Sequence, residues 1–320
     1  MATDLIGDIG GTNVRFALLK DGDVVQEETL QCNDYDGLAP AVRAYLEMTG
    51  HDGVIRNAAF AIAGPVLGDR FQMTNHPWSF SISDVRGKLG FEKLKLVNDF
   101  HALAMAIPHL GEKDMVQIGE GSIKHGAPKG ILGPGTGLGV ASLFWDGTHY
   151  RPAPGEGGHV TMPAKTRREY DIFDWLRAEK YSHISAERVC SGKGLVNVYT
   201  ALRGLDGRHD LPDLTPEEIS DAARNKDNPL AEEAWDLMTG FLGTVAGNLA
   251  LTLGAHGGIY IAGGIMPKSA DLMCHTYFRD QFQSKGRFEE YLRAIPTFVI
   301  THPFPAFAGL QAYLCGKQPA

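Results

Sequence analysis

Two glycine-rich bends, each leading into an apolar strand that ends at an Asp-Gly turn, constrain the fold of this chain most strongly. The first bend runs from Gly7 to Asn13, and its strand turns at Asp21-Gly22. The second runs from Gly133 to Gly139, and its strand turns at Asp146-Gly147. Asp-Gly is a common hairpin dipeptide, so both segments are predicted to be β-hairpins. Because the two similar patterns lie 126 residues apart, they predict a duplicated unit.

Helical and extended patterns alternate around the hairpins. Apolar residues recur at helical spacing over 38–46, strands are predicted over 58–63 and 93–97, and a helix is predicted over 101–110. In the second half the same patterns predict helices around 172–176, after the capping box Thr215-Pro216-Glu217-Glu218, over 241–253 and over 307–314, and a strand over 259–262. Strands that alternate with helices are typical of an α/β protein with a mainly parallel sheet.

The composition restricts the class of protein further. A chain of 320 residues fits two packed lobes or one large α/β domain. Its 30 basic and 38 acidic residues give a net charge of −8, which argues against a nucleic-acid binder, because such proteins neutralise phosphates with Lys and Arg. The four cysteines are scattered without a C-x-x-C pair, and the N-terminus lacks the basic start of a secretory signal. We therefore expect a cytoplasmic protein with reduced thiols.

The segment 237–267 contains no Asp, Glu, Lys or Arg, and its length would suffice to span a bilayer. It also holds eight glycines together with Asn248 and His256, and it divides around Gly254 into a helix-like half and a strand-like half. Irregular backbone exposed to lipid would leave its polar groups unpaired. We therefore expect this segment to be buried core, and we expect no association with a membrane.

The first bend has the composition of a phosphate-binding loop. Glycines permit positive φ angles and let backbone N–H groups approach an anion without side-chain hindrance. A tight hairpin rich in turn residues is the alternative. Asp8 favours the first interpretation, because a carboxylate beside phosphates is repulsive unless Mg²⁺ lies between them, either directly or through water.

The second bend carries glycines at alternate positions, 133, 135, 137 and 139. If this segment is extended, one of its faces has no side chains, so something must approach it closely. The spacing departs from the G-x-G-x-x-G fingerprint and leads into a strand where that motif requires a helix, which argues against a Rossmann dehydrogenase. Ser191 to Gly194 resembles a P-loop only superficially, since Glu187 stands at the position of its first glycine.

Polar residues suited to a substrate occur in three places. Asn98-Asp99 ends a predicted strand before a helix, at the sheet edge where α/β proteins bind ligands, and a helix N-cap is the alternative for this Asp. Glu156 and His159 lie in a glycine-rich loop, with a solvated turn as the alternative. Glu187 by itself indicates a charge on a short helix, facing solvent or paired with Arg188. Two phosphate loops with several acceptors and donors imply phosphoryl transfer to a sugar.

At this point the chain resembles the bacterial glucokinases, from about residue 4 to about residue 300. The motifs that carry the resemblance, in the family's order, are Gly7 to Asn13, Thr74-Asn75-His76-Pro77-Trp78, Asn98-Asp99-Phe100, Gly133 to Gly139, Pro154 to His159, Ser185 to Gly192 and Ile261-Ala262-Gly263-Gly264. The resemblance implies a duplicated ribonuclease H-like, actin-like ATPase fold, with two lobes around a central cleft. We expect a small α/β lobe over 1–110 and 300–320 and a large α/β lobe over 111–299.

The resemblance also implies roles for individual residues. Asp99 is expected to be the general base, and the sugar hydroxyls are expected to bind Asn98, Asp99, Glu156, His159 and Glu187. Glu187 is nominated by the resemblance alone. The nucleotide is expected at the first loop, Gly7, Asp8, Ile9, Gly10, Gly11 and Thr12, at the second loop, Gly135, Thr136 and Gly137, and on the adenosine side at Gly263 and Gly264, with Asp8 at the Mg²⁺.

The activity that the resemblance implies is Mg²⁺-dependent transfer of the γ-phosphoryl group of ATP to the 6-hydroxyl of D-glucose, the first step of glycolysis. The expected partners are glucose and MgATP, and a homodimer is typical of the family. An actin-like or chaperone-like ATPase switch and a sugar-responsive regulator without kinase activity are the alternatives. Zinc is not expected, because the cysteine-rich motif of the related repressor/kinase group does not follow His159. The segment 301–307 is more aromatic and richer in proline than the family leads us to expect.

Overall fold

The computed structural model describes residues 3–73, 76–273 and 276–316. Thr74 and Asn75 of the motif that ends at Trp78 lie outside the described residues. The chain divides into two compact units, one made of Met1–Gly111, Asp146–Pro154 and His302–Ala320, the other of Glu112–Trp145 and Gly155–Thr301. The main difference from the lobes expected from the sequence is the segment 146–154, which was expected in the large lobe and belongs to the first unit.

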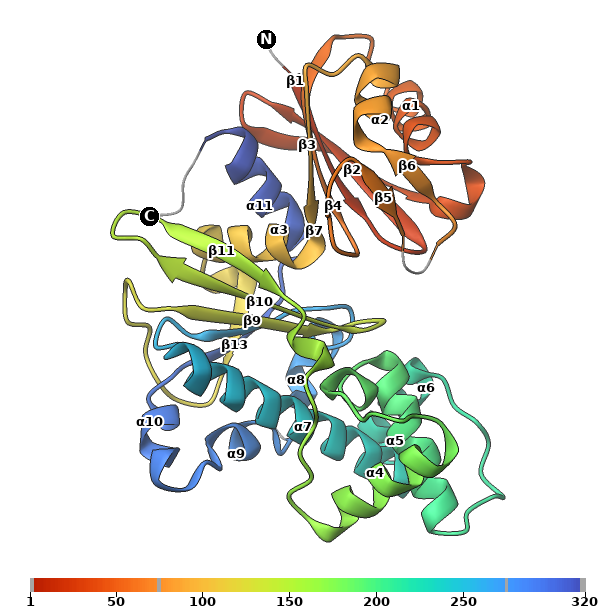
Figure 1. Ribbon diagram of the computed structural model, residues 1–320, viewed down its shortest axis with the longest axis vertical. Coiled ribbons are helices and arrows are strands. Elements are labelled where there is room, and N and C mark those ends of the chain that lie inside the picture. Colours follow the sequence, from red (N-terminus) through yellow and green to blue (C-terminus); the bar gives the residue numbers. More distant parts are fainter. Residues whose placement is uncertain (1–2, 74–75, 274–275, 317–320) are drawn as a thin grey trace. The chain divides into compact units, whose positions relative to one another are not determined.

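The first unit is built on a five-stranded sheet with the order β3-β2-β1-β4-β7 (Figure 1). Its strands are β1 (Thr3–Ile9), β2 (Asn13–Lys20), β3 (Asp23–Gln31), β4 (Ile55–Ile62) and β7 (Lys93–Asn98). β1 and β2 form the predicted antiparallel hairpin, while β4 runs parallel to both β1 and β7. A small second sheet joins β5 (Arg70–Gln72) to β6 (Ser79–Ser81).

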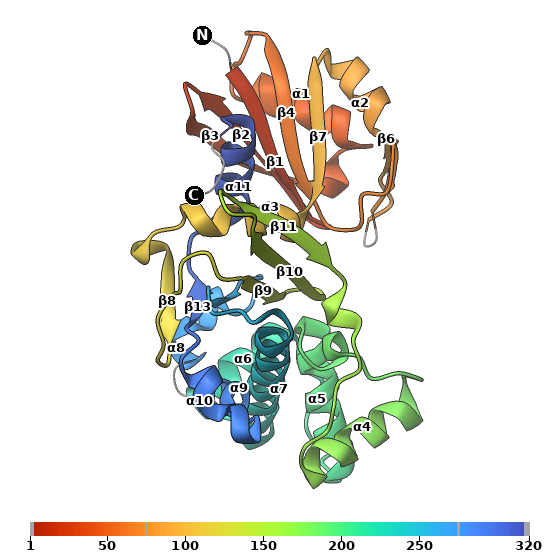
Figure 2. The same cartoon turned by 60° about the vertical axis from the view of Figure 1, so that its left-hand side comes forward.

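Helices cover both faces of this sheet, because successive residues of a strand point to opposite faces. Leu5 packs in a core with residues of α1 (Leu38–Met48) and α2 (Ile82–Leu89). The next residue, Ile6, packs in a separate core with residues of α3 (Asp99–Ala106) and α11 (Pro305–Leu314). Figures 1 and 2 show the two helix pairs on the two sides of the sheet.

A six-stranded sheet has the order β11-β10-β9-β12-β13-β8, and all of its strands except β11 belong to the second unit. Its strands are β8 (Met115–Ile118), β9 (Lys129–Pro134), β10 (Leu138–Trp145), β11 (Tyr150–Gly155), β12 (Ile259–Ile261) and β13 (Thr297–Ile300). β9 and β10 form the second predicted hairpin, and β12 runs parallel to β9 and β13. The order β2-β1-β4 of the first sheet is therefore repeated as β10-β9-β12, which confirms the predicted duplication and the α/β class.

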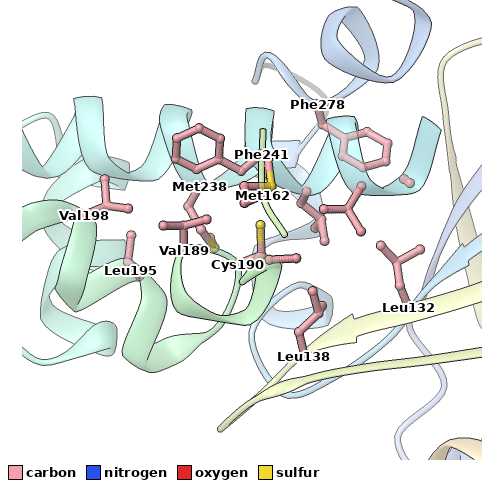
Figure 3. Packing of buried hydrophobic residues seen from close by; sticks show 14 of the residues in the cluster. Leu132, Leu138, Met162, Val189, Cys190, Leu195, Val198, Met238, Phe241 and Phe278 are labelled. Atoms are coloured by element: carbon pink, nitrogen blue, oxygen red, sulfur yellow. The ribbon is translucent and has the colours of Figure 1, made fainter. Parts of the chain in front are cut away.

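The helices of the second unit pack together beside the sheet. They are α4 (Arg167–Glu179), α5 (Gly192–Leu205), α6 (Pro216–Asn225), α7 (Pro229–Leu253), α8 (Ala270–Met273), α9 (Phe278–Gln283) and α10 (Glu289–Arg293). Figure 3 shows part of the large apolar core, in which Leu132 and Leu138 of the strands lie with Cys190, Met238 and Phe241 of the helical side. This core fixes the strand ends from which the second glycine-rich bend departs.

Helix α7 begins at Pro229, earlier than the apolar pattern predicted, because Asn228 caps its N-terminus. The Oδ1 atom of Asn228 accepts hydrogen bonds from Leu230 N and Ala231 N at 3.0 and 3.3 Å. The helix ends at Gly254, whose φ of 62° is left-handed, so the charge-free segment divides into a helix and a strand as expected. Within the described parts of the chain, no helix combines the length and the apolar character that crossing a membrane requires.

The aromatic, proline-rich segment near the C-terminus packs within the first unit. Pro305 takes the first position of α11, and Phe307 is buried in the same core as Ile6. The guanidinium of Arg15 lies over the ring of Phe304, 5.9 Å from its centroid. The aromatic side chains therefore attach α11 to the sheet that carries the first glycine-rich bend.

At Gly309, helix α11 packs directly against the backbone of α3. A Cβ atom at this position would overlap the carbonyl oxygen of Ala102 and would lie 3.0 Å from the backbone nitrogen of Ala106. Because Asp99 is the first residue of α3, this backbone contact holds the helix on which Asp99 is placed.

Replacement of Gly309 by alanine should destabilise the protein by about 1–3 kcal/mol, the usual range for overpacking a tight contact, and urea denaturation of the full chain measures this. Gly87→Ala is the matched control, since Gly87 is an exposed residue of α2 and a Cβ there has no neighbour within 4 Å. That variant should gain about 0.5–1 kcal/mol from helix propensity. A gain at both positions would contradict the packing argument.

Candidate functional site

In the first glycine-rich bend, the reason for glycine at position 7 is the lack of room for a side chain. Neither Gly7 nor Gly10 has a positive φ, so the conformational reason expected from the sequence does not apply to them. Gly7 lies in β1, where a Cβ would come within 2.8 Å of the rings of Phe16 and Phe60. Gly10 N donates a hydrogen bond to Asn13 O at 2.9 Å, which closes the turn of the hairpin.

Asp8 stands at the end of β1, opposite Arg15 of β2 in the hairpin register. Arg15 Nη1 donates a hydrogen bond to Asp8 Oδ2 at 3.3 Å, and the Asp8 side chain is 28% exposed. Burial raises the pKa of Asp8, and the charge of Arg15 opposes this rise. A partly exposed carboxylate fits Mg²⁺, which usually takes one or two carboxylates, several waters and phosphate oxygens.

Asn98 caps helix α3. Its Oδ1 atom accepts hydrogen bonds from Phe100 N at 2.9 Å and His101 N at 3.2 Å, and its Nδ2 atom donates to Gly64 O at 3.2 Å. Asp99 is therefore not the N-cap, and the alternative that the sequence left open for it is wrong. The cap fixes the end of β7 to the start of α3, so it holds the adjacent Asp99 in place.

Asp99 is a half-buried carboxyl with an unusual affinity for its proton. Burial is the main reason that its pKa rises to about 6, and the negative charge of Asp8 adds to the rise. The Phe100 N–H, which donates to Asp99 Oδ1 at 2.9 Å, opposes it. A carboxyl that ionises near neutral pH has the properties of a general base in phosphoryl transfer.

The second bend is the tight turn between β9 and β10. Gly133 pairs with Gly139 across the hairpin, and Gly135 N donates to Gly137 O at 2.8 Å. A Cβ at Gly133 would lie 2.7 Å from the carbonyl carbon of Ala262 and 2.9 Å from the nitrogen of Gly263. The close neighbour that alternating glycines predicted is therefore the backbone that follows β12, and the structure brings two expected nucleotide segments together.

Helix α5 begins beside the same turn. Gly192 N donates to Gly135 O at 2.8 Å, and the helix is capped by Ser191, whose Oγ atom accepts from Gly194 N at 2.9 Å. The position of this segment at the second bend was not foreseen from the sequence. The signal was present, because a serine before a Gly-x-Gly and an apolar helical pattern is a helix start.

Glu156 directly precedes the short 3-10 turn η4 (Gly157–His159), and His159 is its last residue; the turn packs on β10. A Cβ at Gly157 would lie 2.9 Å from Val140, so this packing needs glycine. The side chains of Glu156 and His159 are 71% and 61% exposed, and Oε2 and Nε2 are 3.9 Å apart. The two polar groups are thus presented together on a turn that is fixed to β10.

Glu187 lies in the 3-10 turn η5 (Ala186–Arg188). Ala186 N donates a hydrogen bond to Val160 O at 2.9 Å, which joins this turn to the segment after η4. Its Oε2 atom accepts a hydrogen bond from Leu138 N at 3.0 Å. Arg188 instead stacks over the ring of Tyr181 at 4.2 Å. The interpretation of Glu187 as a solvent-facing charge or a partner of Arg188 is therefore wrong, and the carboxylate lies at the second bend.

Comparison with known proteins agrees with this geometry. The family model described as Glucokinase matches residues 5–317. The chain belongs to the glucokinase family. It is 47% identical over 318 residues to a glucokinase of Paramagnetospirillum magneticum, covering 99% of this chain and 98% of that protein. The chain is a hexokinase-type sugar kinase. The match includes the segment 301–317, which lies beyond the motifs that carry the resemblance.

Solved structures agree on the fold. A glucokinase from an Antarctic psychrotroph matches with a TM-score of 0.86 and 32% identity, covering 99% of both chains. A ROK family glucokinase from Streptomyces griseus, solved with glucose and AMPPNP, matches with a TM-score of 0.65 and 18% identity, covering 98% of this chain and 99% of that one. The fold is the actin-like ATPase fold, as the sequence motifs implied.

Among the side chains that the structure describes, no three of His, Cys, Asp and Glu gather as metal ligands. A cation held by protein ligands alone, such as structural zinc, needs about four of them. Asp8 with a bound nucleotide would satisfy Mg²⁺ without such a cluster, because the phosphates and waters complete its octahedral shell.

Asp99→Asn should stabilise the protein at pH 8 by about 1–3 kcal/mol, since each pKa unit corresponds to about 1.4 kcal/mol. A carboxyl whose pKa is higher in the folded than in the unfolded chain disfavours folding above its folded pKa of about 6. The gain should therefore shrink as the pH falls through 6 and be largely lost by about pH 4, as measured by urea denaturation. Asp84→Asn, which removes an exposed acid from the first turn of α2, should give no gain.

Proposed function

We propose that this chain phosphorylates glucose. The reaction transfers the γ-phosphoryl group of MgATP to the 6-hydroxyl of D-glucose and gives glucose 6-phosphate and ADP, the first step of glycolysis. The observation that carries the proposal is the Asp99 carboxyl, with its pKa raised to about 6, at the start of α3 in a chain of the glucokinase family. The AMPPNP and glucose bound by the Streptomyces griseus protein support the choice of substrates.

Asp99 is proposed as the general base. Since the transition state of phosphoryl transfer is loose, the hydroxyl needs to lose its proton only late, and alignment supplies much of the acceleration. A carboxylate with a pKa near 6 is ionised at neutral pH and still accepts a proton readily. Asn98 supports this role by capping α3, and we propose that it also contacts the sugar.

The remaining sugar contacts are assigned to the second unit. Glu156 and His159 project from η4, and their carboxylate and imidazole can accept and donate to neighbouring hydroxyls. Glu187 offers a carboxylate at the second bend. Acceptors and donors at fixed positions suit a polyol, whose hydroxyls each need both kinds of partner.

The nucleotide is assigned to the bends. The first loop (Gly7, Asp8, Ile9, Gly10, Gly11, Thr12) and the second loop (Gly135, Thr136, Gly137) would contact the phosphates, through backbone N–H groups other than those of Gly10 and Gly135, which close the two turns. Gly263 and Gly264 would lie toward the adenosine. Asp8 would hold Mg²⁺, directly or through water, and this ion would neutralise charge on the transferred phosphoryl group. Arg15 keeps the Asp8 carboxylate oriented through its hydrogen bond.

The cellular setting follows from the proposed reaction. An enzyme that uses MgATP and free glucose acts in the cytoplasm, and we propose a homodimer there, as is typical of the family. An ATPase that drives a conformational switch is the second candidate, since the actin-like fold serves such proteins too. The family match favours the kinase.

A coupled assay with MgATP and glucose, mannose or fructose tests the proposal. Glucose should be phosphorylated, and ADP release should depend on the sugar. Asp99→Asn should lower kcat by about 10² to 10⁴ while glucose still binds, as expected for loss of a general base. Asp84→Asn, which removes an exposed acid elsewhere in the same unit, should keep kcat. ADP release that ignores sugar would favour the switch, and normal turnover of Asp99→Asn would refute the base assignment.

A further inference from the structure

Glu187 is a sugar-binding residue under the proposed function, yet its carboxylate accepts a hydrogen bond from the nucleotide side. The donor is Leu138 N, at 3.0 Å from Glu187 Oε2. Leu138 is the first residue of β10 and follows directly on Gly135, Thr136 and Gly137. One carboxylate therefore contacts the end of the second phosphate loop.

The Glu187 carboxylate also lies directly against Gly137. A Cβ on Gly137 would overlap Glu187 Oε2 and lie 3.2 Å from Glu187 Cδ. The φ of Gly137 is not positive, so its backbone conformation does not itself require glycine. A side chain at this position would therefore displace the end of the Glu187 side chain.

The contact belongs to a connected structure with little freedom to move. Ser191 Oγ donates to Glu187 O at 2.8 Å, and Gly192 N donates to Gly135 O at 2.8 Å. The side chain of Leu138 is buried in the apolar core, where Figure 3 shows it with Cys190. The segment from Glu187 to Gly192 thus contacts the second loop at both of its ends.

We infer that Glu187 couples the binding of sugar to the binding of nucleotide through its hydrogen bond with Leu138 N. This inference rests on the proposed function. A carboxylate can accept several hydrogen bonds at once, so a sugar hydroxyl bound to Glu187 orients the same group that fixes the second loop. The loop in turn presents its N–H groups to the phosphates. Coupling of this kind is reciprocal, so nucleotide strengthens sugar binding by the same factor.

Gly137→Ala tests the inference, because it displaces the Glu187 carboxylate while leaving that residue in the chain. Calorimetry with glucose alone should show the Kd for glucose raised about tenfold to a hundredfold, the loss expected for a hydrogen bond to a charged group. Gly87→Ala is the control, since it adds the same methyl group at an exposed residue of α2 that has no proposed role in binding, and a Cβ there has no neighbour within 4 Å. This control should leave the Kd for glucose unchanged.

The coupling itself is measured by titrating AMPPNP with and without saturating glucose. Glucose should lower the Kd for AMPPNP in the wild-type protein, by a factor within the usual range of about 5 to 150, and should lose this effect in Gly137→Ala. Glu187→Asp, whose shorter side chain withdraws the carboxylate from Leu138 N, should lose it as well and serves if Gly137→Ala does not fold.

The two proposals fail in different ways. A wild-type protein that does not phosphorylate glucose refutes the proposed function. A wild-type protein that phosphorylates glucose but shows no effect of glucose on AMPPNP binding refutes the inference, as does a Gly137→Ala variant that binds glucose as tightly as Gly87→Ala. Loss of coupling in Gly137→Ala and Glu187→Asp, with coupling kept in Gly87→Ala, supports it.

Discussion

The second unit depends on the direct approach of one stretch of backbone to another at the end of its sheet. Gly133 lies against Ala262 and Gly263 so closely that a single Cβ would separate them. The same closeness lets Gly135 O accept the first N–H of α5. Because protein interiors are close-packed, such contacts have no room to adjust. The turn, the strand end and the helix start therefore behave as one rigid structure, and Glu187 is added to it through Leu138 N.

In the first unit, helix capping, packing and burial together determine the position and the pKa of Asp99. Asn98 caps α3, Gly309 lets α11 press on the same helix, and Asp99 is held half-buried at its start. Burial and the nearby charge of Asp8 raise the pKa of Asp99 to about 6. This arrangement costs stability at neutral pH, and the cost is acceptable if the carboxyl has to take a proton from a substrate. Groups whose pKa is raised in this way are common at functional sites.

Much of the fold was accessible from the sequence because it depends on local patterns. The Asp-Gly turns, the alternating apolar residues and the capping box at Thr215 act over a few residues, and the corresponding elements were found at nearly the expected places. The boundaries that were missed have local causes too: Asn98 and Asn228 begin their helices earlier than the apolar pattern suggested. The reason for the glycines in the first bend was misjudged, since Gly7 avoids the rings of Phe16 and Phe60, which come from other strands.

The sequence by itself determined the α/β class, the duplicated hairpins and, through its motifs, the family and the candidate residues. Only the tertiary structure decided what Glu187 does, because its hydrogen bond joins residues 49 positions apart in the chain. It likewise decided the raised pKa of Asp99, which depends on burial and on the charge of Asp8, a residue far away in the sequence but near in space. Local patterns report the conformation of a segment, whereas desolvation and contacts between segments arise only when the chain has folded.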